Sequence, residues 1–359
     1  MKGKKLAILI SISVVVIAIV IAAIYAFNFW NNMDTFGKNT PGPGIANISN
    51  LKANKATKKG LYVKIPVGAS TESIAELLTQ LGVIDNPTVF KFISKMKGYD
   101  SKYRAGTFYI AWNMAYFEMM KAFSGMPAVV KVVIPEYMNI YQTAAKLEKA
   151  GLVNAKEFLD YSSTVKCNDR FVKYIPESRN PRYEGYLFPA TYQFERTVTM
   201  KEIVNQMLQA FDTRFTLAKY AKAKAIDMTP DQVVTLASIV EREAANPSEF
   251  KTIAGIFINR LKIGMRLQSD ATINYYLSTL PDKSVVSGVN FTAIETPYNT
   301  YLHDGLTPGP ICSPSEQAMD AVLNYEKNEY YYFLAKGDGT SAFSKTYPEH
   351  QAAIAQYLR

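Results

Sequence analysis

Apolar side chains form an unbroken run near the start of the chain. Residues 6–30, LAILISISVVVIAIVIAAIYAFNFW, contain no charged side chain, and about 20 apolar residues are enough for a helix to cross a bilayer. The apolar core of a cleaved signal peptide is shorter, at about 7–15 residues. The run therefore predicts a transmembrane helix, while the small residues of IAAIYAF leave signal cleavage as an alternative.

The charges around this run predict its orientation. Lys2, Lys4 and Lys5 precede it, and the next lysine is Lys38. Because basic residues favour the cytoplasmic side of a membrane, we expect residues 1–5 to be a cytoplasmic tail. The helix is then a single-pass anchor in the plasma (inner) membrane, and the body of the chain is periplasmic or otherwise extracytoplasmic.

The pattern changes twice beyond the anchor. Residues 31–60 are rich in Asn, Gly, Pro and Lys and lack periodicity, which is typical of a linker. From Leu61 onward, YVKIPVGASTESIAELLTQLGVI predicts a short strand, a turn at Gly68 and a helix capped at Ser70 or Thr71.

The same plan recurs in VVIPEYMNIYQTAAKLEKAGLV, which predicts a second strand–helix unit and an α+β fold. Gly106, within YRAGTFYI, suits a tight turn or bulge. The aromatic stretch EGYLFPATYQF, residues 184–194, is more typical of a core than of a binding site. We place one subdomain at 61–126 and a larger domain at 127–359.

A well-marked helix follows in the larger domain. Thr229 is a plausible N-cap, Pro230 fits the first helical position, and Gln232 completes a capping box. We expect the helix to continue to about Asn246, before Pro247. Ser248 then caps a second helix, SEFKTIAGIFINRLKIG, which ends near Gly264.

Two glutamates lie at the end of that first helix. At 100° per residue, its apolar arc comprises Val233, Leu236, Ala237, Ile239 and Val240. Glu243 falls among the larger apolar side chains, and Glu241 lies on the opposite shoulder. A carboxyl group in such a place is costly to ionise, so its pKa rises, as a general acid requires. A structural salt bridge is the alternative.

Polar and aromatic side chains are concentrated downstream of these glutamates. Hydrogen-bonding groups beside aromatic rings suit a sugar polymer, and a basic aromatic surface also suits single-stranded nucleic acid; export argues against nucleic acid as a partner. The candidate substrate-binding residues are Glu241, Asn259, Arg260, Gln268, Ser269, Asp270, Thr272, Tyr298, Asn299 and Tyr301.

Composition narrows the remaining chemistry. The net charge is +9, which favours an acidic partner such as anionic lipid or acidic polymer or else reflects a solvated basic surface. Two cysteines and two histidines make neither a disulfide framework nor a zinc or histidine-rich metal site. Whether Cys167 and Cys312 form one bridge stays open.

Several ordered motifs carry a family resemblance. LASIVEREA, NRLKIGMRLQSD, PYNTY, GLTPGPI, YYYFLAKGDG and FSKTYPEH, together with RAGTFY and EGYLFPATY, resemble those of the MltG/YceG-like endolytic murein transglycosylases over roughly residues 60–359. The first strand–helix unit resembles a LysM-like glycan-binding region. The expected fold is therefore a transmembrane helix, a small LysM-like α+β subdomain and a larger α+β YceG-like catalytic domain.

This resemblance implies a specific activity. The family cuts peptidoglycan glycan strands internally, between MurNAc and GlcNAc, and leaves 1,6-anhydroMurNAc ends. It acts without metal or cofactor and beside peptidoglycan synthases, which are implied partners. The family acid is the second glutamate of its ASI-V-E-x-E pattern, which is Glu243 here. One carboxyl group then serves as acid and base, unlike the paired carboxylates of most glycosidases.

Four positions depart from the family pattern. Thr307 replaces the first proline of GLPPGPI, Ala271 replaces the proline of Asp-Pro-Thr, and Ala190 replaces the aspartate of FPDTY. Ser341 stands where the family often has histidine. Two alternatives to a transglycosylase are a non-catalytic wall-binding scaffold and a muramidase that uses water, with Asp270 as its second carboxylate.

Overall fold

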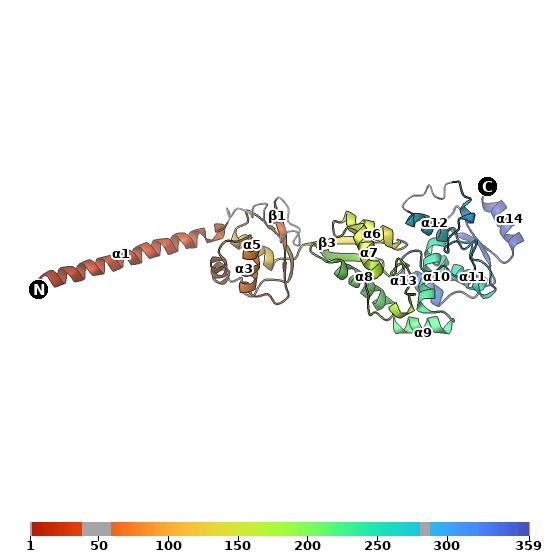
Figure 1. Cartoon of the computed structure of the whole chain (residues 1–359), viewed down its shortest axis with the longest axis horizontal. Coiled ribbons are helices and arrows are strands. Elements are labelled where there is room, and N and C mark those ends of the chain that lie inside the picture. The colour runs from red at the N-terminus through yellow and green to blue at the C-terminus, as the bar shows by residue number, and fades with distance from the viewer. Residues whose placement is uncertain (1, 38–58, 281–287, 359) are drawn as a thin grey trace. The chain divides into compact units, whose positions relative to one another are not determined.

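The computed structural model describes residues 2–37, 59–280 and 288–358. The chain divides into two compact units (Figure 1). The first holds Met1–Val130 and Glu195–Thr197, and the second holds Lys131–Phe194 and Val198–Arg359. Helices and short strands alternate in both units, so the predicted α+β class is confirmed.

Within its described residues, the first unit contains one pair of strands and four α-helices, of which the long N-terminal helix is the first. Strand β1 pairs with β2 in antiparallel register, from Gly60 opposite Ala111 to Ile65 opposite Gly106. Ser70, rather than Thr71, caps the helix after β1 by accepting a hydrogen bond from the Ser73 N–H. The elements are α1 (Lys2–Asn32), the 3-10 turn η1 (Met33–Thr35), β1 (Gly60–Ile65), α3 (Thr71–Gln80), α4 (Pro87–Met96), β2 (Gly106–Ala111) and α5 (Tyr116–Ser124).

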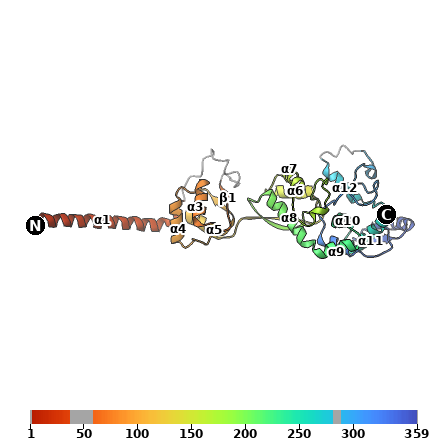
Figure 2. The ribbon, with the colours of Figure 1, turned by 60° about the horizontal axis from the view of Figure 1, so that its bottom comes forward.

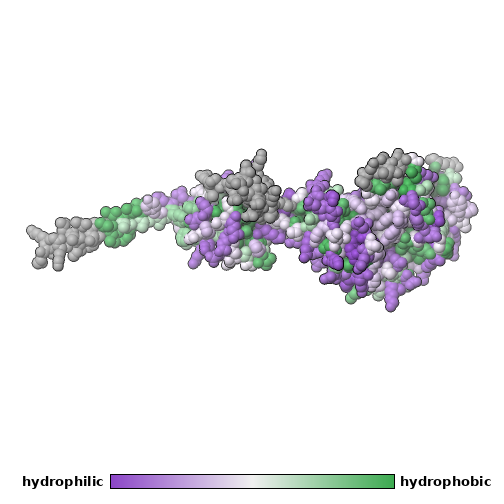
Figure 3. All heavy atoms as spheres, viewed as in Figure 1, coloured by the Kyte–Doolittle hydropathy of each residue, from purple (hydrophilic) through white to green (hydrophobic). Residues whose placement is uncertain are grey.

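Helix α1 confirms the predicted apolar helix. Within the described part of the chain, Val14–Thr35 is the one helical stretch long and apolar enough to cross a membrane, and the 18-residue apolar window within it is not buried. Figure 3 shows the hydrophobic surface along the described portion of this helix. Long apolar side chains such as Ile19 and Tyr25 are 62% and 72% exposed, so α1 has an unpartnered apolar surface.

The residues immediately after residue 30 differ from the predicted linker. Residues 31–37 continue α1, form η1 and pack on the core, because Met33 is fully buried. The ring of Phe36 lies 5.5 Å from that of Tyr116, and the Phe36 carbonyl accepts the Tyr116 N–H at 2.9 Å. Apolar side chains therefore place this stretch in the unit. Residues 38–58 of the predicted linker lie outside the described residues.

A short return segment completes the first unit. The Thr107 hydroxyl donates to the Glu195 carboxylate at 2.7 Å and lies 2.7 Å from the Thr197 hydroxyl. Gly106 has φ +132°, and a Cβ there would meet Pro127 at 2.5 Å. Because no other residue fits so close to the proline ring, Gly106 allows this close approach at the start of β2.

The second unit is mainly helical. Strand β3 pairs with β4, and β5 pairs with β6 in antiparallel fashion. Its elements are β3 (Val129–Ile134), α6 (Ile140–Lys149), α7 (Ala155–Thr164), η3 (Val172–Tyr174), β4 (Ala190–Glu195), α8 (Met200–Arg214), α9 (Leu217–Ala225), α10 (Pro230–Glu243), η4 (Pro247–Glu249), α11 (Phe250–Lys262), α12 (Asp270–Thr279), η6 (Phe291–Ala293), α13 (Glu316–Leu323), β5 (Tyr332–Ala335), β6 (Ser341–Ser344) and α14 (Tyr347–Tyr357).

Two local predictions for this unit are confirmed. Strand β3 followed by α6 repeats the plan of β1 and α3, and Gly82 and Gly151 both have positive φ just beyond their helices. In the aromatic stretch, Tyr186, Leu187 and Phe194 are buried. Tyr186 stacks on Phe171 with ring centres 4.9 Å apart, so this stretch belongs to the core.

Helix α10 lies at the centre of the second unit. It contacts α9, α11, α12 and α13, and Figure 2 shows α9, α11 and α12 around it. Every residue from Val233 to Val240 is buried, including the polar Thr235 and Ser238. The middle of the helix is thus covered on all sides rather than along one arc, whereas Gln232 in its first turn and Arg242 in its last turn are exposed.

Candidate active site

The start of α10 agrees with the sequence prediction, and its end does not. Thr229 accepts the Gln232 N–H, and the Gln232 side chain accepts the Thr229 N–H, which completes the capping box. The helix ends at Glu243, because Ala244 is extended. Asn246 is not helical but caps the next turn, η4, by accepting the Ser248 N–H at 3.0 Å. Ser248 is therefore not the predicted cap, and α11 begins at Phe250.

Glu243 is consequently the last residue of α10, and it faces the start of α12. Its Oε1 accepts a hydrogen bond from the Ser269 hydroxyl and a second, at 3.4 Å, from the Ala271 N–H. Neither donor contacts Oε2 among the described residues. Burial raises the pKa of the Glu243 carboxyl, as does Asp270, while the hydrogen bonds from Ser269 and Ala271 and the charge of Arg260 act in the opposite direction.

Glu241 contacts a different element. Its Oε2 accepts the Ser315 hydroxyl at 2.6 Å and the Ser315 N–H at 3.0 Å. Ser315 in turn caps α13 by accepting the Ala318 N–H at 3.0 Å. Burial also raises the pKa of Glu241. Glu241 therefore supports the first turn of α13, and the two glutamates point to opposite shoulders as the helical wheel predicts.

Four of the predicted binding residues lie close to Glu243. Ser269 touches it directly. The exposed Asp270 begins α12 and accepts the Tyr301 hydroxyl at 2.7 Å. Arg260 is 5% exposed and donates to the carbonyl oxygens of Tyr331 and Leu267, at 2.7 and 2.6 Å. The Arg260 guanidinium thus holds two chain segments beside the acid.

Gln268 has an unusual backbone. Its φ is +49°, a left-handed conformation that side chains other than glycine adopt rarely. The Gln268 N–H donates to the Thr300 carbonyl at 3.1 Å, and the side chain is exposed. Backbone strain of this kind is concentrated at functional sites. It places the Gln268 side chain on the surface directly before Ser269.

The remaining predicted residues are engaged with the protein itself. The Asn259 amide donates to the carbonyls of Asn328 and Tyr330 at 2.9 and 3.1 Å. The Asn299 amide donates to Ile294 at 2.7 Å. Thr272 is fully buried and donates to the Ser269 carbonyl at 2.7 Å. Tyr298 packs on Tyr275, with ring centres 4.9 Å apart. Their binding roles remain predictions.

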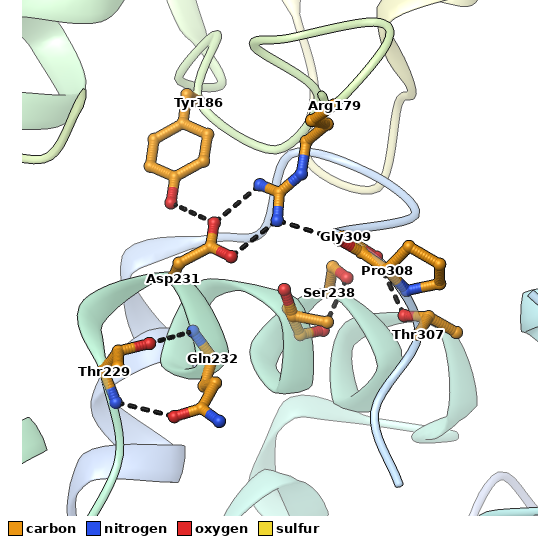
Figure 4. Close-up of polar contacts among 10 residues, drawn as sticks. Arg179, Tyr186, Thr229, Asp231, Gln232, Ser238, Thr307, Pro308 and Gly309 are labelled. Carbon is orange, nitrogen blue, oxygen red and sulfur yellow. Dashed lines mark hydrogen bonds and ion pairs between the residues drawn. The ribbon is translucent and has the colours of Figure 1, made fainter. Parts of the chain in front are cut away.

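An ion pair that sequence reasoning missed holds the GLTPGPI turn (Figure 4). Arg179 donates to both carboxylate oxygens of Asp231, at 2.6 and 2.5 Å, and to the Pro308 carbonyl at 2.9 Å. The Tyr186 hydroxyl donates to Asp231 at 2.7 Å. Arg179 and Asp231 are 52 residues apart, and no local pattern relates them. The pair fastens the turn to the first turn of α10.

Three of the four family departures have structural partners. The buried Thr307 hydroxyl donates to the Gly309 carbonyl at 2.8 Å, so it restrains the turn in place of a proline ring. The Ser341 N–H and hydroxyl both donate to the Glu249 carboxylate at 2.7 Å. Ser341 therefore attaches β6 to the segment between α10 and α11. Ala271 supplies the N–H that donates to Glu243 at 3.4 Å, and a proline has no such N–H. Nothing in the structure explains Ala190.

Other polar groups lie away from Glu243. Among the described residues, no three His, Cys, Asp or Glu side chains form a metal-ligand group. Cys167 and Cys312 are both free thiols. A surface hollow lined by Tyr174, Tyr220 and Thr229 lies at the beginning of α10. Because a helix rises 1.5 Å per residue, this hollow is about 20 Å from the acid and is not its cleft.

The geometry suits general acid catalysis. A partly buried carboxyl with a raised pKa retains its proton nearer to neutral pH. One of its oxygens is fixed by two donors, and the other accepts no hydrogen bond from the residues that the structure describes. Exposed Gln268 and Asp270 border it. Such an arrangement can supply a proton donor to a bound molecule.

The chain is similar to known proteins over most of its length. The family model of the YceG-like family matches residues 63–356. A Bacillus subtilis protein named endolytic murein transglycosylase is 32% identical over 85% of this chain and 86% of its own length. A Streptococcus pneumoniae protein of the same name is 30% identical over 86% of this chain, which spans only 60% of that relative. A crystal structure of a yceG-like protein from Listeria monocytogenes superposes with a TM-score of 0.54 at 30% identity and covers 82% of this chain and 99% of that one.

Proposed function

Because the chain belongs to the YceG-like family, we propose that it is a membrane-anchored endolytic lytic transglycosylase. Its substrate is the glycan strand of peptidoglycan, cleaved between MurNAc and GlcNAc. The observation that carries the proposal is Glu243, held at the end of α10 with Oε1 fixed by Ser269 and Ala271. The names of the Bacillus and Streptococcus relatives support the substrate class.

Glu243 performs both proton transfers in this proposal. Its protonated Oε2 donates to the glycosidic oxygen as the C1–O bond of MurNAc breaks. The carboxylate then accepts the proton of the same sugar's 6-hydroxyl while O6 bonds to C1. The products are a 1,6-anhydroMurNAc end and a new GlcNAc hydroxyl, with no water consumed. A raised pKa favours the first transfer, and the Ser269 hydrogen bond stabilises the carboxylate for the second.

The remaining assignments complete the proposal. Helix α1 is the single-pass anchor in the plasma membrane, with a cytoplasmic N-terminus and an extracytoplasmic catalytic unit. The first unit acts as a LysM-like glycan-binding module, and peptidoglycan synthases are partners. Gln268, Asp270 and Tyr301 contact the glycan, since they border Glu243. Neither a metal nor a cofactor takes part.

The test is mass spectrometry of the muropeptides that the full chain releases from purified sacculi. Anhydro-terminated fragments support the proposal. Reducing ends instead indicate a muramidase that uses water, with Asp270 as the second carboxylate. Binding without release indicates a wall-binding scaffold. The Glu243→Gln protein serves as the matched control, and anhydro products from both proteins at equal rates would refute the assignment.

A further inference from the structure

We infer that α4 of the first unit lies in the headgroup layer of the membrane that α1 spans, with Phe92 and Met96 inserted among the lipids. The partner is a phospholipid surface, and the inference rests on the proposed anchoring by α1. It assigns to the first unit a membrane contact that is separate from any contact with glycan.

The first step is the joint between α1 and the unit. Met33, in the turn directly after α1, is fully buried in the unit's core. Lys97, just beyond α4, forms an ion pair with Asp34 at 2.7 Å. The Tyr116 N–H donates to the Phe36 carbonyl at 2.9 Å. These contacts fix the end of the apolar helix against the unit, so the unit begins where the helix ends.

The second step is the depth of α4. The ring of Phe29, in the last turns of α1, lies 5.8 Å from that of Phe92 in α4. Trp30, the neighbour of Phe29, is 55% exposed, and tryptophan favours the interface between lipid and water. Five residues separate Trp30 from Thr35, the end of the candidate span, a rise of about 8 Å in a helix. Phe92 therefore lies at interfacial depth.

The third step is the exposed face of α4. Phe92 and Met96 are 49% and 44% exposed, and a spacing of four residues puts them on one face of the helix. The exposed apolar surface of α1 is continuous with this face through the contact of Phe29 with Phe92. Shallow burial of such a face is how interfacial helices bind lipid. The membrane is thus the surface that covers it.

The charges next to this face predict little lipid selectivity. Lys91 is paired with Glu72 at 2.8 Å, and Lys97 is paired with Asp34. Lys95 is exposed, and its aliphatic stem allows the ammonium to reach the headgroups. Because two of the three lysines are neutralised by partners, insertion of Phe92 and Met96 is the main attraction, and neutral lipid supports docking nearly as well as anionic lipid.

Fluorescence quenching in vesicles tests the inference with the full chain. In a Cys167→Ser background, a bimane label is attached at Met96→Cys or at the control Val67→Cys. Val67 is 92% exposed on the same unit but outside α4. Phosphatidylcholine brominated near the headgroup should quench the label at position 96 severalfold more than the label at position 67, with a small change on adding phosphatidylglycerol.

Flotation of the same vesicles separates the two possible failures. A chain that does not float with the lipid overturns both the anchor and this inference. A chain that floats while positions 96 and 67 are quenched equally, or while position 96 is not quenched, overturns the docking of α4 alone. Introducing Phe92→Ser should lower quenching at position 96, and unchanged quenching would also contradict the inference.

Discussion

Glu241 and Glu243 occupy neighbouring positions on opposite shoulders of one helical turn, and each is fixed by a different serine. Ser315 binds Glu241 and Ser269 binds Glu243. Both pKa values are raised by burial, so the pKa shift alone does not identify the acid. The partners differ: both hydrogen bonds of Glu241, on its Oε2, come from the residue that caps α13. Those of Glu243, on its Oε1, come from Ser269 and Ala271 at the start of α12, beside the exposed Gln268 and Asp270.

Glu243→Gln should abolish the proposed activity while preserving the fold. The amide retains the shape of the side chain but neither donates nor recovers the proton, and one such transfer is typically worth about 10²–10⁴ in rate. Since Glu243 performs two transfers, we expect a loss at or beyond the upper value. Release of anhydro-muropeptides and thermal melting are the measurements. Glu241→Gln is the control and should cost less, and an inactive, folded Glu241→Gln protein would transfer the acid to Glu241.

Ser269→Ala should shift the pH profile toward higher pH. The Ser269 hydrogen bond lowers the pKa of Glu243, so its removal raises that pKa further and keeps the acid protonated to higher pH. The upper limb of kcat/KM against pH should therefore move upward, while the rate falls because the carboxylate is less stabilised. Ser315→Ala, which removes the corresponding contact of Glu241, should leave the limb in place. Equal shifts in both variants would contradict the assignment.

Glu184 should make the protein less stable as pH rises through the neutral range. It is 1% exposed, and burial raises its pKa from 4.5 to about 7, against hydrogen bonds from the Ile140 and Gly185 N–H groups. Between these pH values the folded state keeps a proton that the unfolded state has lost, so stability falls by about 3 kcal/mol in total. Below pH 4.5 the group adds no pH dependence.

Glu184→Gln should remove this slope, because the amide does not ionise. Urea unfolding at pH 4.5, 6 and 8 gives the free energy of unfolding of both proteins. The difference between them isolates the contribution of Glu184, since all other groups titrate equally. A difference between the two proteins that does not change with pH would show that Glu184 ionises normally in the folded state.

At the scale of elements, local signals predicted the start of α10 correctly, but its end and the start of α11 incorrectly. The capping box of Thr229 and Gln232, a motif of four consecutive residues, specifies the start of α10. The end of α10 was harder to predict, because an asparagine at position 246 can either continue the helix or cap the next turn. In the structure, Asn246 caps η4. The polar residues near the site show the same limit. Asn259 and Asn299 suit a sugar by type, but long-range contacts with backbone carbonyls occupy their amides.

The pair of Arg179 with Asp231 was also beyond local prediction, and it yields an element-scale test. Asp231→Asn should destabilise the protein by about 3–5 kcal/mol, because it leaves a buried guanidinium without its counter-charge; the Arg179 and Asp231 side chains are 5% and 11% exposed. Asp160→Asn is the matched control in an exposed pair with Lys156 and should change stability by less than about 1 kcal/mol. Equal effects in urea unfolding would show that the buried pair does not hold the turn.

At the scale of the whole molecule, the position of a truncation should matter. A fragment beginning at residue 31 retains Met33 in the first core, whereas one beginning at residue 59 loses it. Loss of a large buried side chain costs about 2–5 kcal/mol, so the shorter fragment should melt at a lower temperature. Met33→Ala in the longer fragment should reproduce most of the effect. Identical melting of all three proteins would mean that residues 31–37 add nothing to the core.

Residues 195–197 belong to the first unit although they follow 64 residues of the second, Lys131–Phe194. In the gene, the first unit is therefore encoded by two separate stretches. A single crossover with a relative, placed near codon 130, would replace residue 107 with its counterpart from the relative and keep the old Glu195 and Thr197. Such hybrids would lose matched contacts. The unit is thus expected to be inherited together with the catalytic unit, and not exchanged as a cassette.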